Sequence, residues 1–320
     1  RNLMAEPRVD TVVRGGKVVT SSQVQDVSVA IKDGKIAALG PENLLPKADQ
    51  YIDAEGRFVL PGLIDAHVHL AQALIRGCGE GLPLIRWLTE RVWPLEGSYV
   101  GDEGKVSAEL CVLEMLKSGT TTFLEAFLAE RYGLDAIAEV VRDSGIRGYL
   151  SKMIMDVPSY AGKEEVMFHG MREDPSTSIR LAREMHARWD GAEDGRIKVW
   201  LGPHAIGASS EEGLRGVVAL AKELDTGIGI HFCETREEGV FIRERYGCSP
   251  TEFLERIGML GKDVLLIHSI WIDQEDIDRL AATGTNVVHN PSANTKMGSG
   301  IAKIPDMVRA GVNVVLGCDG

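Results

Sequence analysis

Short runs of alternating apolar and polar residues fill the first part of the chain, from Val9 to Phe58. The run from Val27 to Ile31 is followed by Lys32-Asp33-Gly34-Lys35, which is typical of a tight hairpin turn. The run from Thr11 to Val19 is broken by Gly15-Gly16. These patterns predict a small antiparallel sheet that precedes the main domain.

From Gly62 onward, short apolar runs alternate with longer amphipathic stretches. We expect eight strands, ending near His69, Glu125, Met155, Gly202, Phe232, His268, Asn290 and Asp319. Helices are expected between them, including Gly104–Ser118, Leu134–Asp143, Ser178–Trp189, Glu211–Leu224 and Gln274–Ala282. Eight such units predict an α/β fold, a (β/α)8 TIM-like barrel over residues 62–320, with its site at the C-terminal ends of the strands. An open doubly wound sheet is the alternative, but no G-x-G-x-x-G motif follows an early strand.

The composition is that of a soluble globular protein, with 44% hydrophobic and 26% charged residues. The formal net charge is -12 and the basic residues are scattered, which argues against nucleic acid or an anionic membrane as a partner. Five cysteines, an odd number without a C-x-x-C pair, fit free thiols in a reducing cytoplasm. A small-molecule substrate is the expected partner, and a homo-oligomer is possible.

Histidines gather where the predicted strands end. His67 and His69 are spaced i, i+2, so they lie on the same side of a strand and could share a metal ion. Of the eight histidines, six fall at predicted strand ends: His67, His69, His204, His231, His268 and His289. The barrel hypothesis brings all six around one opening.

Two acidic residues are placed at the same predicted rim. Glu234 follows the strand that ends in His231-Phe232, and Asp319 ends the last strand. Imidazoles with one carboxylate suit Zn²⁺ and also Fe²⁺. Alternatively, Glu234 is an acid at a helix N-terminus and Asp319 is a turn residue before Gly320.

Several segments together resemble the amidohydrolase superfamily, and more narrowly its 5-methylthioadenosine/S-adenosylhomocysteine deaminases, triazine hydrolases and guanine deaminases. The signature of the first strand is Pro61-Gly62-Leu63-Ile64-Asp65-Ala66-His67-Val68-His69. The later motifs are Ser118-Gly119-Thr120-Thr121-Thr122, Gly202-Pro203-His204, His231-Phe232-Cys233-Glu234-Thr235, His289-Asn290-Pro291-Ser292 and Leu316-Gly317-Cys318-Asp319-Gly320. The resemblance implies that residues 1–61 are the N-terminal part of a β-sandwich whose C-terminal strands are missing here. The barrel pattern itself predicts a closing helix after the eighth strand, and the sequence stops before it.

The resemblance also implies roles for single residues. The ligands of one divalent metal ion, usually zinc, would be His67, His69, His231 and Asp319. Glu234 would move protons to the ring nitrogen and the leaving amine, His268 would hydrogen-bond the attacking hydroxide, and His289 could orient Asp319. Substrate contacts would come from His204 and from Glu96, the latter on ribose hydroxyls, and Trp87 could line the same pocket.

The sequence departs from the family mainly where substrate is bound. Ala205-Ile206-Gly207 follows His204 in place of a Pro-Tyr pair, which removes an aromatic wall. Ala293-Asn294 replaces Ser-Asn, and no arginine clearly matches the one expected before the fourth strand. The resemblance therefore predicts a metal-dependent deaminase of an amino-substituted purine nucleoside. The alternatives are a free-base, pterin or triazine hydrolase and an inactive protein used for assembly.

Overall fold

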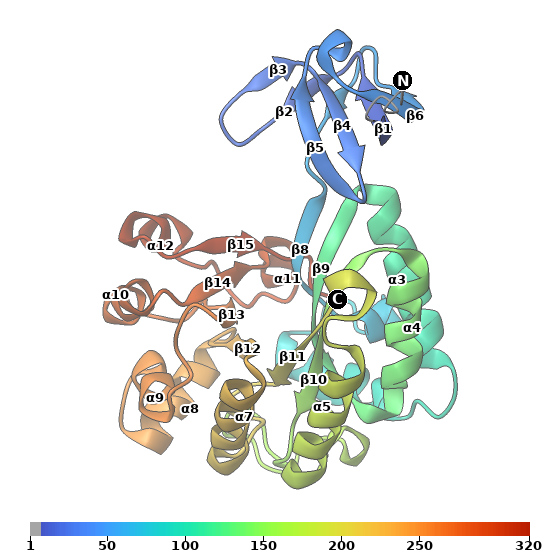
Figure 1. Ribbon diagram of the computed structural model, residues 1–320. Helices are drawn as coiled ribbons and strands as arrows, with labels where there is room; N and C mark the ends of the chain where they lie inside the picture. Colours follow the sequence, from blue (N-terminus) through green and yellow to red (C-terminus); the bar gives the residue numbers. More distant parts are fainter. Residues whose placement is uncertain (1–7) are drawn as a thin grey trace. The chain divides into compact units, whose positions relative to one another are not determined.

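The computed structural model describes residues 8–320, which form two compact units (Figure 1). The first unit ends at Gly62 and the second spans Leu63–Gly320. Each unit has its own hydrophobic core, and each is described by itself.

The first unit consists of two small β-sheets. One has the strand order β5-β4-β1-β6 and the other β3-β2-β7. Its strands are β1 (Arg8–Arg14), β2 (Lys17–Val19), β3 (Val24–Asp26), β4 (Ser28–Lys32), β5 (Lys35–Gly40), β6 (Lys47–Asp53) and β7 (Phe58–Val59), with a 3-10 turn η1 (Glu42–Leu44).

The predicted hairpin joins β4 to β5, and its turn residues Asp33 and Gly34 have φ of 50° and 70°. Both values lie in the left-handed region that a type I′ turn requires. The prediction of a purely antiparallel sheet was wrong, because β1 pairs in parallel with β6 and β2 with β7. Local alternation identifies strands but does not reveal pairing between strands far apart in sequence.

The second unit contains the predicted eight parallel strands in sequential order, which confirms the TIM-like α/β barrel. They are β8 (Leu63–Val68), β9 (Thr120–Leu128), β10 (Arg147–Ile154), β11 (Ile197–Pro203), β12 (Ile228–Phe232), β13 (Val264–His268), β14 (Asn286–His289) and β15 (Val314–Leu316). The first and last strands meet where Asp319 N donates to His67 O over 2.9 Å. All eight C-terminal strand ends are thereby directed toward one opening.

Helices follow the strands and cover the outside of the curved sheet (Figure 1). The longer ones are α3 (Glu103–Ser118), α4 (Leu134–Ser144), α5 (Pro175–Trp189), α7 (Glu211–Leu224), α8 (Arg236–Tyr246), α9 (Pro250–Ile257), α10 (Gln274–Thr283) and α12 (Ile304–Ala310). Short helical segments occupy the connections: η2 (Leu70–Ile75), α1 (Leu84–Trp87), η3 (Leu88–Val92), α2 (Trp93–Glu96), η4 (Glu130–Tyr132), η5 (His169–Met171), α6 (Ala192–Gly195) and α11 (Pro291–Lys296).

Local sequence signals explain where several helices begin. Capping boxes start α9, at Ser249 with Glu252, and α10, at Asp273 with Asp276. In each box, the side chains satisfy backbone N–H groups that the first turn of a helix leaves unpaired. The start of α9 ends the connection from α8, and the start of α10 fixes the length of the loop after β13.

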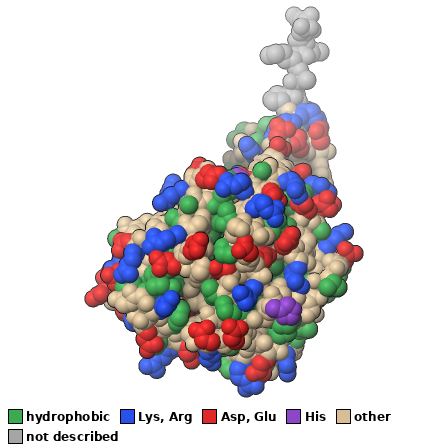
Figure 2. Space-filling view, turned by 90° about the horizontal axis from the view of Figure 1, so that it is seen from below, with side chains coloured by type: hydrophobic (Ala, Val, Ile, Leu, Met, Phe, Trp, Pro, Cys, Tyr) green, Lys and Arg blue, Asp and Glu red, His purple; other side chains and the backbone are tan. Residues whose placement is uncertain are grey.

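The surface carries both signs of charge. On the face shown in Figure 2, Lys and Arg side chains are interspersed with Asp and Glu. Within residues 8–320, no helix combines the length and the apolar content needed to cross a membrane.

Candidate active site and metal centre

Four predicted ligands converge at the C-terminal ends of the barrel strands. His67 and His69 come from the end of β8, His231 from β12, and Asp319 follows β15. His67 Nε2 lies 3.1 Å from Asp319 Oδ1, and His69 Nε2 lies 3.2 Å from the same oxygen. His231 Nε2 is 3.4 Å from His69 Nε2.

These separations fit a tetrahedral metal site. Zn²⁺ binds imidazole nitrogen at about 2.0–2.1 Å, so two ligand atoms of a tetrahedron are about 3.3–3.4 Å apart. The three imidazoles and the carboxylate therefore have the spacing, as well as the chemistry, to hold one divalent ion. His268 also lies within reach of this group, since its Nε2 is 3.6 Å from Asp319 Oδ2.

The protonation states of three of the four ligands support the same conclusion. Burial lowers the pKa of His67 to about 4, and it lowers the pKa of His231 well below the usual value. Burial works against the charge of Asp319, but His67 and His69 outweigh it and hold the pKa of Asp319 well below its usual range. Neutral imidazoles and an ionised carboxylate are the forms in which these groups bind a metal. Burial lowers the pKa of His69, but Asp319 outweighs burial and raises it to about 8, so His69 has to release a proton when a metal binds.

Neighbouring groups fix the orientation of two of the imidazole rings. His231 Nδ1 lies 2.9 Å from the carbonyl oxygen of His204, which accepts its hydrogen bond. His69 Nδ1 faces Glu125 Oε1 at 4.0 Å, and Glu125 also accepts hydrogen bonds from the backbone N–H groups of Leu70 and Phe127. Partners of this kind direct the other ring nitrogen toward a metal.

Glu234 lies beside the centre and keeps one carboxylate oxygen available. Its Oε1 accepts a hydrogen bond from Ser299 Oγ at 3.0 Å, whereas Oε2 lies 3.4 Å from His268 Nε2. Trp271 Nε1 donates to the carbonyl oxygen of Ser299 at 2.7 Å and so holds the serine in place. Burial raises the pKa of Glu234, which favours a carboxyl group that can both give and take a proton.

His268 is held from its far side by Asn294, whose Oδ1 lies 2.8 Å from His268 Nδ1. The amide nitrogen of Asn290 lies 3.2 Å from the same ring nitrogen. In the tautomer in which Nδ1 donates to Asn294, Nε2 carries no hydrogen and can accept one from water. His268 has a φ of 75° and Asp319 a φ of 69°, both in the left-handed region that non-glycine residues rarely adopt. Such backbone conformations cost about 1–3 kcal/mol each and persist only where the surroundings enforce them.

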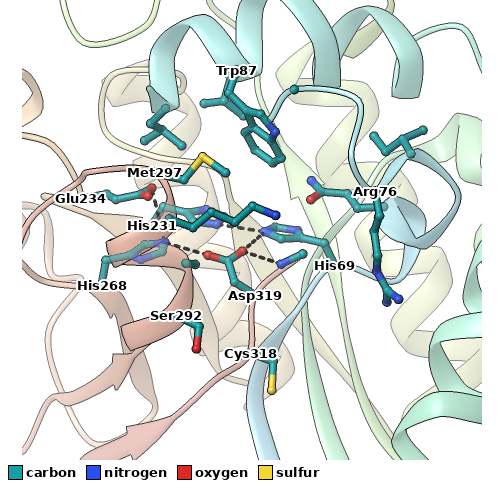
Figure 3. A pocket seen from close by; sticks show the side chains of 18 of the residues that line it. His69, Arg76, Trp87, His231, Glu234, His268, Ser292, Met297, Cys318 and Asp319 are labelled. Carbon is teal, nitrogen blue, oxygen red and sulfur yellow. Dashed lines mark hydrogen bonds and ion pairs between the residues drawn. The ribbon is translucent and has the colours of Figure 1, made fainter. Parts of the chain in front are cut away.

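A cavity of about 280 Å³ opens over these residues. In Figure 3, Trp87 and Met297 lie on one side of it and Asp319 on the opposite side. Its polar floor comprises His69, Gln72, His204, His231, Glu234, His268 and Asp319, and its apolar wall comprises Ile75, Leu84, Trp87, Leu88, Phe127, Tyr160 and Met297. This combination suits a flat, polar ring.

The structure places the other predicted site residues as follows. His204 and Trp87 line the cavity, and His67 is buried directly beneath it. Glu96 does not line the cavity, because its buried side chain lies behind Gln72, with which it shares a hydrogen bond. His289 also lies outside the cavity lining, and within residues 8–320 the partners of Asp319 are His67, His69, His268 and Gly320 rather than His289.

Sequence reasoning did not identify Gln72, Glu125, Tyr160, Asn294 and Ser299 as parts of the site. Asn294 follows the His289-Asn290-Pro291-Ser292 motif, so its position in the sequence could have indicated that it belongs to the site. Tyr160 lies in the long connection between β10 and α5, and nothing in the surrounding residues indicates where that connection folds.

The fold and the site together define a (β/α)8 barrel protein with a divalent-metal site at the C-terminal ends of its strands. The chain belongs to the amidohydrolase family, whose sequence profile matches residues 58–320. This confirms the resemblance deduced from the motifs.

Individual relatives agree with this assignment. The chain is 39% identical over 295 residues to a 5-methylthioadenosine/S-adenosylhomocysteine deaminase of Desulforudis audaxviator, covering 91% of this chain and 64% of that protein. It is 36% identical over 315 residues to a 5'-deoxyadenosine deaminase of Methanosarcina acetivorans, covering 97% and 69%. A crystal structure of an adenosine deaminase from Xanthomonas campestris with bound zinc has a TM-score of 0.87 at 27% identity, covering 98% of this chain and 70% of that one. The chain thus spans roughly two thirds of the length of these relatives.

Proposed function

We propose that this protein is a metal-dependent aminohydrolase that removes the amino group from a purine nucleoside such as an adenosine derivative. The observation that carries the proposal is the position of Glu234, a buried carboxyl group with one available oxygen, beside four converging metal ligands at the floor of a cavity. The names of the relatives, adenosine-derivative deaminases, support the choice of substrate.

The ligand set His67, His69, His231 and Asp319 would hold one Zn²⁺, or alternatively Fe²⁺. A divalent metal there supplies a Lewis acid that makes water nucleophilic at neutral pH. The remaining chemistry belongs to side chains of the chain itself. His268 Nε2 accepts a hydrogen bond from the attacking water. Glu234 takes one proton from that water and gives it to the ring nitrogen, then takes the proton that remains on the added hydroxyl group and gives it to the amine, which leaves as ammonia.

The cavity accounts for selection of a flat ring. Trp87 and Phe127 offer aromatic surfaces, while Gln72 Oε1 and His204 Nδ1 are buried polar atoms without a hydrogen-bond partner in residues 8–320. An unmade hydrogen bond of this kind costs about 1–3 kcal/mol, which a polar ligand recovers. A heterocyclic amine satisfies both requirements.

The test is a screen for ammonia release from the purified, metal-loaded protein. The panel comprises 5'-deoxyadenosine, 5-methylthioadenosine, S-adenosylhomocysteine, adenosine, adenine, guanine, a pterin and an amino-triazine. We expect the adenosine derivatives to give the highest kcat/KM. A preference for free bases, pterins or triazines would support the alternative class of substrate, and the absence of any release would contradict the proposal.

Glu96 is expected to decide between nucleosides and free bases. A carboxylate can accept hydrogen bonds from two neighbouring ribose hydroxyls, each contributing about 1.5–3 kcal/mol when water is excluded. In the structure, Glu96 Oε2 is buried and has no partner within residues 8–320. Because Gln72 separates Glu96 from the cavity, the ribose contact requires the side chain of Gln72 to turn aside when the nucleoside binds. We therefore expect Glu96→Ala to lower kcat/KM by roughly 10-fold or more for adenosine derivatives and to leave free bases nearly unchanged.

Steady-state kinetics with adenosine and adenine measures this difference. Glu90→Ala is the control, because Glu90 belongs to the same segment but pairs with Arg86 on the surface. An equal loss for both substrates would show that Glu96 only supports the fold behind Gln72.

The proposed partner is thus a small heterocyclic amine. The interspersed charges on the face in Figure 2 and the net charge of -12 offer no basic surface to nucleic acid there. All five cysteines are free thiols, which supports a reducing compartment such as the cytoplasm.

A further inference from the structure

Tyr160 is a buried aromatic residue on the wall of the cavity, in the connection between β10 and α5. It is 1% exposed, and its ring meets those of Trp93 and His204 edge-on, with ring centroids 5.6 and 5.9 Å away. Glu234 and His204 line the same cavity as Tyr160. Tyr160 thus belongs to the part of the cavity wall next to His204, in the cavity where the reacting ring would lie.

Tyr160 lines the cavity, and no hydrogen bond joins its hydroxyl group to another residue within residues 8–320. A tyrosine hydroxyl in such a place normally finds a partner. Two other cavity residues carry buried polar atoms without a partner in the same part of the chain, Gln72 Oε1 and His204 Nδ1. These two atoms, together with the hydroxyl group of Tyr160, indicate a polar ligand.

The backbone around Tyr160 depends on a glycine that follows His204. Tyr160 and Lys163 form a tight turn through hydrogen bonds in both directions, and Ala161 and Gly162 within it have φ of 47° and 80°. This turn packs directly against Gly207, where a Cβ atom would lie 2.6 Å from Ala161 N. No real Cβ approaches a backbone atom so closely, so the turn can occupy this place only because residue 207 is glycine.

This packing explains the departure from the family pattern after His204. Ala205 and Ile206 are buried, and Gly207 makes room for a turn from another part of the chain. The aromatic side chain that the sequence omits after His204 is therefore replaced by Tyr160, which comes from the β10–α5 connection and stands next to the same histidine.

We propose that Tyr160 is a specificity-determining residue that contacts the heterocycle of the substrate, with its ring against the ring plane or edge and its hydroxyl in a hydrogen bond to a ring nitrogen. The identity of the heterocycle, a purine, rests on the proposed function. Gly207 positions Tyr160 by admitting the turn that carries it.

Tyr160→Phe tests the contact, because phenylalanine keeps the ring and removes only the hydroxyl. With 5'-deoxyadenosine as the probe, we expect KM to rise about 10-fold and kcat to change by less than about threefold, the pattern of a contact made equally in the ground and transition states. The 3-deaza and 7-deaza analogues of the same nucleoside locate the bond. The KM effect of Tyr160→Phe should disappear for the analogue that lacks the nitrogen bonded to the hydroxyl, and an equal effect on the parent and both analogues would overturn the ring contact.

The matched control is Tyr246→Phe, since Tyr246 stacks on Phe253 outside the cavity lining. This variant should retain the native KM. A Tyr160→Phe variant whose KM lies within about twofold of the native value would overturn the proposal.

Gly207→Ala tests the positioning argument. The added methyl group should displace the turn, so KM should rise at least as much as in Tyr160→Phe, and combining the two substitutions should add little. Gly216→Ala is the control, because a Cβ at Gly216 would meet only Ile179 at 3.7 Å, an ordinary contact. An unchanged KM in Gly207→Ala would overturn the role of Gly207.

Equilibrium binding separates this proposal from the proposed function. The Kd of 5'-deoxyadenosine is measured by calorimetry in the Glu234→Gln background, where turnover is slow. If the native protein releases no ammonia yet Tyr160→Phe weakens binding about 10-fold, the deaminase assignment fails and the contact stands. If the native protein is a deaminase and Tyr160→Phe leaves both Kd and KM unchanged, the contact fails and the function stands. Absence of any nucleoside binding would overturn both.

Discussion

Replacing Glu234 with glutamine is expected to lower kcat by at least about 10²-fold while leaving the metal content and KM close to native. Glutamine has nearly the same shape and can still accept the hydrogen bond from Ser299, but it cannot carry a proton to the ring nitrogen or to the leaving amine. Burial raises the pKa of Glu234, which supports its use as an acid at neutral pH. The measurement is steady-state ammonia release together with elemental analysis of the same sample.

Glu237→Gln is the matched control for this experiment. Glu237 lies three residues further along, in the first turn of α8, and its side chain is exposed. The same chemical change there should leave kcat unaltered. A native kcat in Glu234→Gln would show that Glu234 is only an acid near the start of a helix.

Replacing His67 with alanine is expected to remove most of the bound divalent metal and nearly all of the activity. His67 is completely buried, and its Nε2 is one of four ligand atoms at the spacing of a tetrahedral site. Three remaining ligands and a void where the imidazole stood would bind an ion much more weakly. Elemental analysis of the purified variant gives the stoichiometry, and about one Zn or Fe per chain is expected for the native protein.

Two further variants keep this result interpretable. Asp319→Asn preserves the shape of a second ligand and removes its charge, so it should also lose metal if the centre is as assigned. His169→Ala, at an exposed histidine outside the cavity lining, should retain the full amount. Full metal content in both His67→Ala and Asp319→Asn would contradict the ligand assignment.

The barrel could be predicted because each of its strands can be recognised from a short local stretch of sequence. An apolar run of a few residues between amphipathic helices identifies a strand of a parallel sheet, and the strand then determines which way its last residues face. His69, His231 and His268 were located in this way, by their position at strand ends. The same logic placed His289 at the opening, but the strand end does not specify how far a side chain reaches toward Asp319.

Residues that enter the site from long connections could not be placed in advance. Gln72 lies in a 3-10 segment after β8 and Tyr160 in a turn after β10, and their positions depend on packing against distant residues such as Gly207. Glu96 was expected to contact the ribose of the substrate, and only the packing of η2 against α2 shows that Gln72 stands between Glu96 and the cavity. Pairing in the small sheets of the first unit was missed for a similar reason, since β1 and β6 are far apart in sequence.

The bond between Asp319 and the end of β8 has a consequence for how the protein assembles. Asp319 and His67 are separated by 252 positions, and their contact joins the first strand of the barrel to the last. Bringing together ends so far apart carries a large loop-closure entropy, so this seam is among the contacts expected to form late in folding. A chain in which β15 has not yet docked presents three imidazoles but no carboxylate. The complete ligand set would then exist only once the barrel has formed. A bound ion would link β8 to β15. Removing the ion with a chelator should therefore increase amide hydrogen exchange in β8 and β15 before the rest of the sheet.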